Sequence, residues 1–234
     1  VDLPRKRKTE SKHVVGNVLT AEELNKLLKT AQHLASGNPT WLVRYAFLDL
    51  VATTGMRAGE ALALQWSDID LDKMQLFITH HIRRVNGKNK VVKGGKTDSS
   101  VRTIPIEESA SAALKQWKKA QLMDAGIMRW VFTSPRQSTT HVAVNTARLW
   151  MQDACTEAGI RYRSLHAFRH TKATLLNDSS VNIRAIADIL GHSNPTITAN
   201  AYIHTTAAGI RQAESVYSSI LEKSGSTSGS DKGQ

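Results

Sequence analysis

The sequence predicts an α+β fold that is mainly α-helical and carries a small three-stranded antiparallel sheet. Apolar residues recur at helical spacing over most of the 234 residues, whereas residues 74–106 alternate in the manner of strands. The composition, with 41% hydrophobic and 22% charged residues, is typical of a globular domain with a full core.

The first helix is expected at residues 20–35, because Thr20 and Glu23 have the spacing of a capping box ahead of a periodic apolar run. A nearly continuous apolar stretch at 41–52 predicts a buried second helix, and Gly55 should end it. Further helices are expected at 58–64, 107–125, 141–158, 166–176 and 182–190, with a short helix across Tyr202.

Three strands are expected, at residues 74–85, 90–92 and 101–106. The dipeptide Asn86-Gly87 follows the first strand and signals a two-residue hairpin, because both residues tolerate a positive φ. Lys96 then falls in the second turn. The apolar piece at 130–132 should lead only into a loop.

We expect one main domain at residues 20–205, flanked by simpler segments. Residues 1–19, which include the run Pro4-Arg5-Lys6-Arg7-Lys8, read as a basic linker or N-terminal extension. Residues 206–223 have the apolar spacing of an amphipathic C-terminal helix. Residues 224–234 lack apolar side chains and are expected to form a disordered tail.

The net charge of +11 and a pI near 9.9 favour a polyanionic partner, because neutralising phosphates releases condensed counterions. Charge alone does not choose between nucleic acid and a membrane surface. The longest apolar stretch, 41–56, is interrupted by Arg44 and Asp49, and no signal-peptide pattern is present. We therefore expect a cytoplasmic protein without a membrane partner, in which the single Cys155 is a buried thiol.

Six residues in distinctive local sequences suit phosphate transfer: Arg57, Lys96, His166, Arg169, His192 and Tyr202. Arginine donates two hydrogen bonds to adjacent phosphate oxygens and stays charged, so Arg57 and Arg169 can clamp the non-bridging oxygens. A desolvated lysine such as Lys96 can protonate a leaving 5′-oxygen. A phenolate such as that of Tyr202 can attack phosphorus and conserve the bond energy without ATP.

Several neighbours of these residues have open roles. Glu60 could orient Arg57 through an i,i+3 pair or simply form a surface salt bridge. His166 and Arg169 share a helix face, whereas His170 is expected to project from a different face and to be structural. Arg102 is expected to be an exposed strand residue or a DNA-backbone contact rather than a catalytic group.

The order and spacing of the motifs resemble the catalytic domain of the tyrosine recombinases, the phage-integrase family, over roughly residues 20–205. The matching segments are Thr54-Gly55-Met56-Arg57-Ala58-Gly59-Glu60, Gly95-Lys96-Thr97-Asp98, Leu165-His166-Ala167-Phe168-Arg169-His170-Thr171, Leu190-Gly191-His192-Ser193 and Ala201-Tyr202-Ile203-His204. The ten-residue step from His192 to Tyr202 is one longer than in several members of the family.

The resemblance implies a site-specific recombinase or integrase that acts on double-stranded DNA as a homotetramer, through a Holliday junction. It implies that Tyr202 forms a 3′-phosphotyrosine and frees a 5′-hydroxyl, that His166 handles protons and that His192 donates to the phosphate. It also implies that the C-terminal helix at 206–223 is exchanged between protomers. A core-binding domain, common in the family, has no room before Thr20, so we expect weak DNA binding and cleavage in preference to recombination.

Alternatives remain at two residues and for the whole chain. Lys93 competes with Lys96 as the catalytic lysine, and Tyr217 is a weaker candidate than Tyr202 because it lies among apolar residues. No metal or nucleotide motif is present, so no cofactor is expected. The rival functions are a type IB topoisomerase-like enzyme and a non-catalytic DNA-binding module of the same fold.

Overall fold

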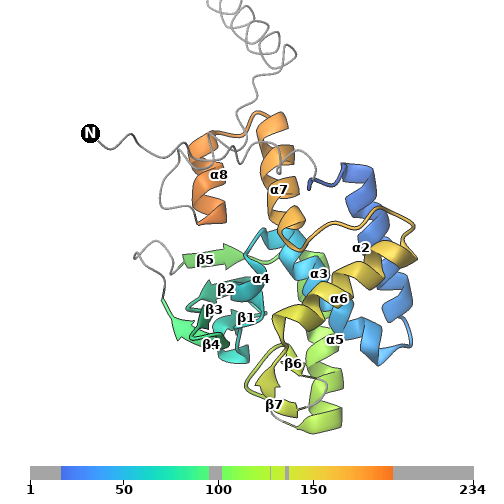
Figure 1. Cartoon of the computed structure of the whole chain (residues 1–234), viewed down its shortest axis with the longest axis vertical. Coiled ribbons are helices and arrows are strands. Elements are labelled where there is room, and N and C mark those ends of the chain that lie inside the picture. The colour runs from blue at the N-terminus through green and yellow to red at the C-terminus, as the bar shows by residue number, and fades with distance from the viewer. Residues whose placement is uncertain (1–16, 95–101, 127, 135–136, 192–234) are drawn as a thin grey trace, which may run out of the picture.

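A computed structural model describes residues 17–94, 102–126, 128–134 and 137–191 (Figure 1). Helices form most of it, and the strands of residues 69–105 lie together to one side of the helical body (Figure 1). The first half contains α2 (Ala21–Ala35), α3 (Pro39–Thr54), α4 (Ala58–Ala61), a 3-10 turn (Trp66–Asp68), β1 (Ile69–Asp70), β2 (Gln75–Ile78), β3 (His80–Val85), β4 (Lys88–Lys93) and β5 (Arg102–Pro105). The second half contains α5 (Glu108–Ala125), β6 (Thr133–Ser134), β7 (Gln137–His141), α6 (Val144–Glu157), α7 (His166–Asp178) and α8 (Ile183–Leu190). The expected mainly helical α+β class is confirmed.

The first two helices form as their sequences predict. The Thr20 hydroxyl accepts from the Glu23 backbone N–H at 3.1 Å, and the Glu23 carboxylate accepts from the Thr20 N–H at 3.0 Å. Helix α3 is buried along most of its length and ends where Gly55 adopts a left-handed φ of 69°. The turn at Gly55 therefore ends α3 two residues before Arg57.

The predicted long strand at 74–85 is wrong, because the chain breaks at Thr79. The Thr79 hydroxyl donates to the Asp68 carboxylate at 3.0 Å, which bends the chain away from one sheet and into another. Strand β2 pairs with β1 and β5 in a three-stranded antiparallel sheet, while β3 and β4 form a separate hairpin. The hairpin turn is the expected one, with φ values of 49° at Asn86 and 76° at Gly87.

A second hairpin, β6 with β7, occupies part of the predicted loop and of the helix expected from residue 141. The helix starts later, at Val144, because the Val142 N–H donates to the Phe132 carbonyl at 2.9 Å and keeps this segment extended. Phe132 in turn packs edge-on against Phe47 of α3, with ring centroids 5.2 Å apart. The core therefore fixes where α6 can begin.

Several predictions lie outside the described residues. These are the basic run at 4–8, the helices expected across Tyr202 and at 206–223, and the tail at 224–234. Cys155 is buried, as expected, and burial raises the pKa of its thiol. Within the described part of the chain, no helix combines the length and the apolar composition needed to cross a membrane.

Candidate active site

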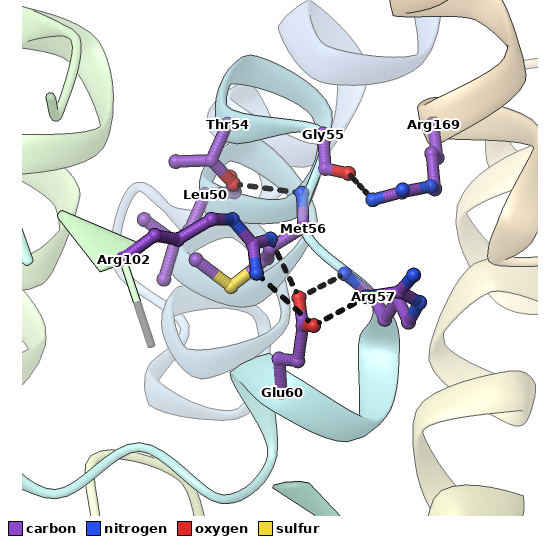
Figure 2. A network of polar contacts seen from close by, with 8 residues as sticks. All are labelled: Leu50, Thr54, Gly55, Met56, Arg57, Glu60, Arg102 and Arg169. Atoms are coloured by element: carbon purple, nitrogen blue, oxygen red, sulfur yellow. Dashed lines mark hydrogen bonds and ion pairs between the residues drawn. The ribbon is translucent and has the colours of Figure 1, made fainter. Parts of the chain in front are cut away.

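Arg57 is oriented by a carboxylate one helical turn away. The Glu60 carboxylate accepts from the Arg57 backbone N–H at 2.9 Å and from its Nη1 at 2.8 Å (Figure 2). The side chain of Glu60 is 5% exposed, whereas that of Arg57 is 45% exposed. The pair is therefore not a surface salt bridge: a buried carboxylate holds an arginine that a ligand can reach.

A second arginine contacts the same carboxylate from β5. Arg102 Nη2 lies 2.9 Å from Glu60 Oε2, and Nη1 lies 3.3 Å from Oε1 (Figure 2). The Arg102 side chain is only 10% exposed, so the expectation of an exposed strand residue is wrong. Sequence reasoning missed this role because the partner lies 42 residues away in the chain.

The two arginines keep Glu60 ionised. Burial raises the pKa of the Glu60 carboxyl, but the hydrogen bonds and charge of Arg102, followed by the backbone N–H and charge of Arg57, outweigh it and hold the pKa below its ordinary value. Two positive charges share one negative charge, so the cluster keeps a net positive charge. An anion is the ligand that such a cluster favours.

Arg169 reaches the same region from α7. Its Nη1 donates to the Gly55 carbonyl at 3.1 Å, and the residue is 2% exposed (Figure 2). One turn later, Lys172 Nζ donates to the Thr53 carbonyl. Both cations of α7 thus bond carbonyls at the carboxyl end of α3, where the helix dipole favours positive charge.

His166 and His170 form a pair on α7, with ring centroids 4.8 Å apart in an edge-to-face arrangement. The expectation that His170 projects from a different face is wrong, because residues at i and i+4 of a helix are neighbours. Desolvation and then the charges of Arg169 and Arg57 lower the pKa of His166. Burial, the charge of His166 and that of Arg169 lower the pKa of His170 from 6.5 to about 4.

Three of the predicted site residues are therefore brought together: Arg57, His166 and Arg169. The other three, Lys96, His192 and Tyr202, lie outside the described residues. The competing Lys93 ends β4 and is exposed. Gly191, which precedes His192, ends α8 with a left-handed φ of 68°.

The hairpin formed by β3 and β4 carries positive charges that are exposed to solvent. Arg83 and Lys90 are directly opposite in register and both are exposed, and Arg84 and Lys88 are exposed as well. Among the described residues no acidic side chain pairs with these four. Between the hairpin and the start of α6 lies a cavity of about 390 Å³ lined by Arg84, Gly87, Asn89, Val144, Asn145 and Arg148.

Metal ligands do not gather in the part of the chain that the structure describes. Within it, no three His, Cys, Asp or Glu side chains lie close enough to hold an ion. The charged groups that do gather are cations around a single carboxylate, an arrangement suited to anions.

Comparison with known proteins identifies a sequence family. The model of the phage integrase family matches residues 17–208. The tyrosine recombinase XerC-like protein of Caldanaerobacter subterraneus subsp. tengcongensis is 36% identical in an alignment of 169 residues that covers 64% of this chain and 43% of the relative. The transposase of transposon Tn916 from Enterococcus faecalis is 25% identical in an alignment of 214 residues that covers 88% of this chain and 52% of the relative.

Solved structures share the fold. The Tn1549 transposon integrase in complex with a circular intermediate DNA has a TM-score of 0.69 at 21% identity, over 93% of this chain and 68% of that one. The XerA recombinase has a TM-score of 0.65 at 23% identity, over 92% of this chain and 66% of that one. The chain spans about half the length of the relatives matched by sequence.

Proposed function

The chain belongs to the phage integrase family, and on that premise we propose that it is the catalytic part of a tyrosine-type site-specific recombinase. Its reaction would cut and rejoin DNA strands through a 3′-phosphotyrosine. One observation carries the proposal: at the end of α3, Arg169 bonds the Gly55 carbonyl two residues before Arg57, and the charges of both arginines act on His166.

In the proposed reaction Arg57 and Arg169 each donate to a non-bridging oxygen of the scissile phosphate. The two cations offset the negative charge that builds on those oxygens as phosphorus becomes pentacoordinate. Arg57 is already accessible, whereas Arg169 has to be uncovered before it can contact a phosphate. His166, which is held neutral at pH 7, can accept or pass on a proton.

The remaining steps are assigned to residues outside the described part of the chain. The Tyr202 oxygen attacks phosphorus as its phenolic proton passes to a base such as His166, the bond from phosphorus to the 5′-oxygen breaks, and Lys96 gives that oxygen a proton. The departing 5′-hydroxyl remains on the cut strand. His192 donates a hydrogen bond to the phosphate. Reversal of this step by a 5′-hydroxyl from a partner duplex would complete strand exchange.

We place this chemistry on double-stranded DNA, in a cytoplasmic homotetramer. The net charge of +11 and the exposed basic hairpin β3–β4 support a DNA partner. Exchange of the helix expected at 206–223 between protomers belongs to the same proposal. The number of protomers in the DNA-bound assembly, measured in solution with and without residues 206–222, tests it, because an unchanged assembly would contradict the exchange.

The test uses nicked suicide duplexes built from candidate attachment sites, incubated in EDTA with the chain or with Tyr202→Phe. We expect a covalent protein–DNA adduct on a denaturing gel, and its loss in the variant. Binding without an adduct, on a duplex that a longer form of the protein cleaves, would favour a non-catalytic module. Resealing of one strand without exchange between two duplexes would favour a topoisomerase-like enzyme.

A further inference from the structure

Arg102 contacts both the carboxylate behind Arg57 and the end of α8. Its two terminal nitrogens lie 2.9 and 3.3 Å from the two oxygens of Glu60, which is the parallel, two-bond geometry that arginine makes with a carboxylate. Both side chains are at least nine-tenths buried. Water therefore cannot replace either partner without a rearrangement of β5 against α4.

The other face of Arg102 lies against the backbone at Gly191. A methyl group placed on Gly191 would lie 2.7 Å from Cζ and Nη1 of Arg102 and 2.8 Å from its Nε. Side-chain carbons do not approach that closely, so the guanidinium fills the space that any other residue would need. Gly191 also has a left-handed φ of 68°, which favours glycine independently.

These contacts join two parts of the proposed site. Glu60 bonds the backbone and side chain of Arg57, so the position of one catalytic arginine depends on this carboxylate. Gly191 precedes His192 directly in the chain. One guanidinium is thus in contact with Glu60, which supports Arg57, and with the turn at Gly191 that ends α8.

We propose that Arg102 is a positioning residue that fixes Arg57, through Glu60, in register with the turn at Gly191 that ends α8, one residue before His192 in the sequence. It does not touch the reacting phosphate. The inference rests on the proposed function, since positioning matters only where Arg57 and His192 act on one phosphate. Misplacing a reacting group by about 1 Å can slow a reaction about 100-fold.

The activity test compares the whole chain with Arg102→Gln and Arg102→Lys in single-turnover cleavage of a nicked suicide duplex at saturating DNA. We expect Arg102→Gln to cleave between about 10- and 100-fold more slowly with DNA affinity within about threefold of wild type. Arg102→Lys keeps the charge but loses the two-bond geometry, so it should recover only part of the rate. Arg44→Gln is the control, because Arg44 pairs with Asp153 at 2.7 Å between α3 and α6, away from this cluster.

The pH profile separates positioning from general stability. The charged groups that face Glu60 are Arg57 on its own turn and Arg102 from β5. Without Arg102, the rise that burial causes in the pKa of Glu60 is less well offset, so the carboxylate should protonate at higher pH. The acid limb of the plot of cleavage rate against pH should therefore move to higher pH. Arg44→Gln should leave that limb in place. An unmoved limb in Arg102→Gln would contradict the proposal.

A second measurement does not depend on activity. Gly191→Ala should lower the urea midpoint of unfolding more in wild type than in an Arg102→Ala background, because only wild type holds the guanidinium against the new methyl group. Equal losses of the urea midpoint in both backgrounds would show that Arg102 does not lie against Gly191. If the wild-type chain forms no adduct, the proposed function fails. If the wild-type chain forms the adduct and both Arg102 variants cleave at the wild-type rate, only the positioning role of Arg102 fails.

Discussion

Two basic regions of this protein use positive charge in opposite ways. In the buried cluster, Arg57 and Arg102 share Glu60, and every contact has a defined length and direction. On the hairpin β3–β4, Arg83 and Lys90 stand exposed, and no ion pair holds them among the described residues. The difference teaches that a paired, desolvated charge fixes geometry, whereas an exposed charge supplies attraction that salt can screen.

The largest expected effect is on stability, from Glu60→Gln. Removing the carboxylate leaves Arg102 as an uncompensated buried charge, so the free energy of unfolding should fall by about 3 kcal/mol. Urea unfolding at pH 7 measures it. Asp153→Asn is the matched control, since Asp153 is 45% exposed in its pair with Arg44 and its loss should cost less than about 1 kcal/mol. Equal losses in the two variants would show that the buried Glu60 stabilises the protein no more than a partly exposed carboxylate does.

Arg57→Lys tests whether direction matters as well as charge. Lysine keeps the charge but cannot donate in the planar two-bond geometry, so the single-turnover cleavage rate should fall about 100-fold. DNA affinity should change little, because the net charge is unchanged. Rapid-quench cleavage at saturating DNA and a parallel binding titration give the two quantities. A variant that cleaves at the wild-type rate would show that Arg57 is only an electrostatic contact.

The double variant Arg83→Gln/Lys90→Gln should change DNA binding and leave the cleavage rate unchanged. If both side chains contact DNA phosphates, the slope of log K against log salt should become shallower by about 2, with an unchanged cleavage rate at saturating DNA. Lys115→Gln/Lys119→Gln removes the same charge from exposed positions on α5 and is the control. Identical slopes for the two double variants would show that the hairpin attracts DNA only through the net charge.

The smallest expected effect concerns His170. Its pKa falls from 6.5 to about 4 in the folded protein, so the folded state binds fewer protons than the unfolded state between these values. Stability should therefore be complete above pH about 6.5 and decline as the pH falls toward about 4. Urea midpoints at several pH values should decline less steeply in His170→Gln. Parallel curves would mean that burial and the charges of His166 and Arg169 do not suppress protonation of His170.

The parts of the fold set by local sequence could be predicted, and those set by distant contacts could not. The capping box of Thr20 with Glu23 and the turn at Asn86-Gly87 involve neighbours in the chain, and both are confirmed. The break at Thr79 depends on a bond to Asp68, which no strand pattern contains. Strand periodicity therefore merged β2 and β3 into one predicted strand.

The candidate site divides in the same way. The motif around Arg57 and the i,i+3 spacing of His166 and Arg169 predicted residues that the fold does bring together. The burial of Arg102 could not be predicted, because it follows from the meeting of β5 with α4. Strand alternation did place Arg102 on the same face as the buried Ile104, but nothing in the local sequence identified Glu60 as its partner.

The most direct test of the account is to map the covalent adduct. The wild-type chain is trapped on a nicked suicide duplex in EDTA, digested with protease and nuclease, and its nucleotide-bearing peptide is sequenced by mass spectrometry. We expect a phosphonucleotide on Tyr202, formed at a strongly reduced rate by Arg57→Lys. An adduct on Tyr217 or on another residue, or one that forms equally fast without the Arg57 guanidinium, would contradict it.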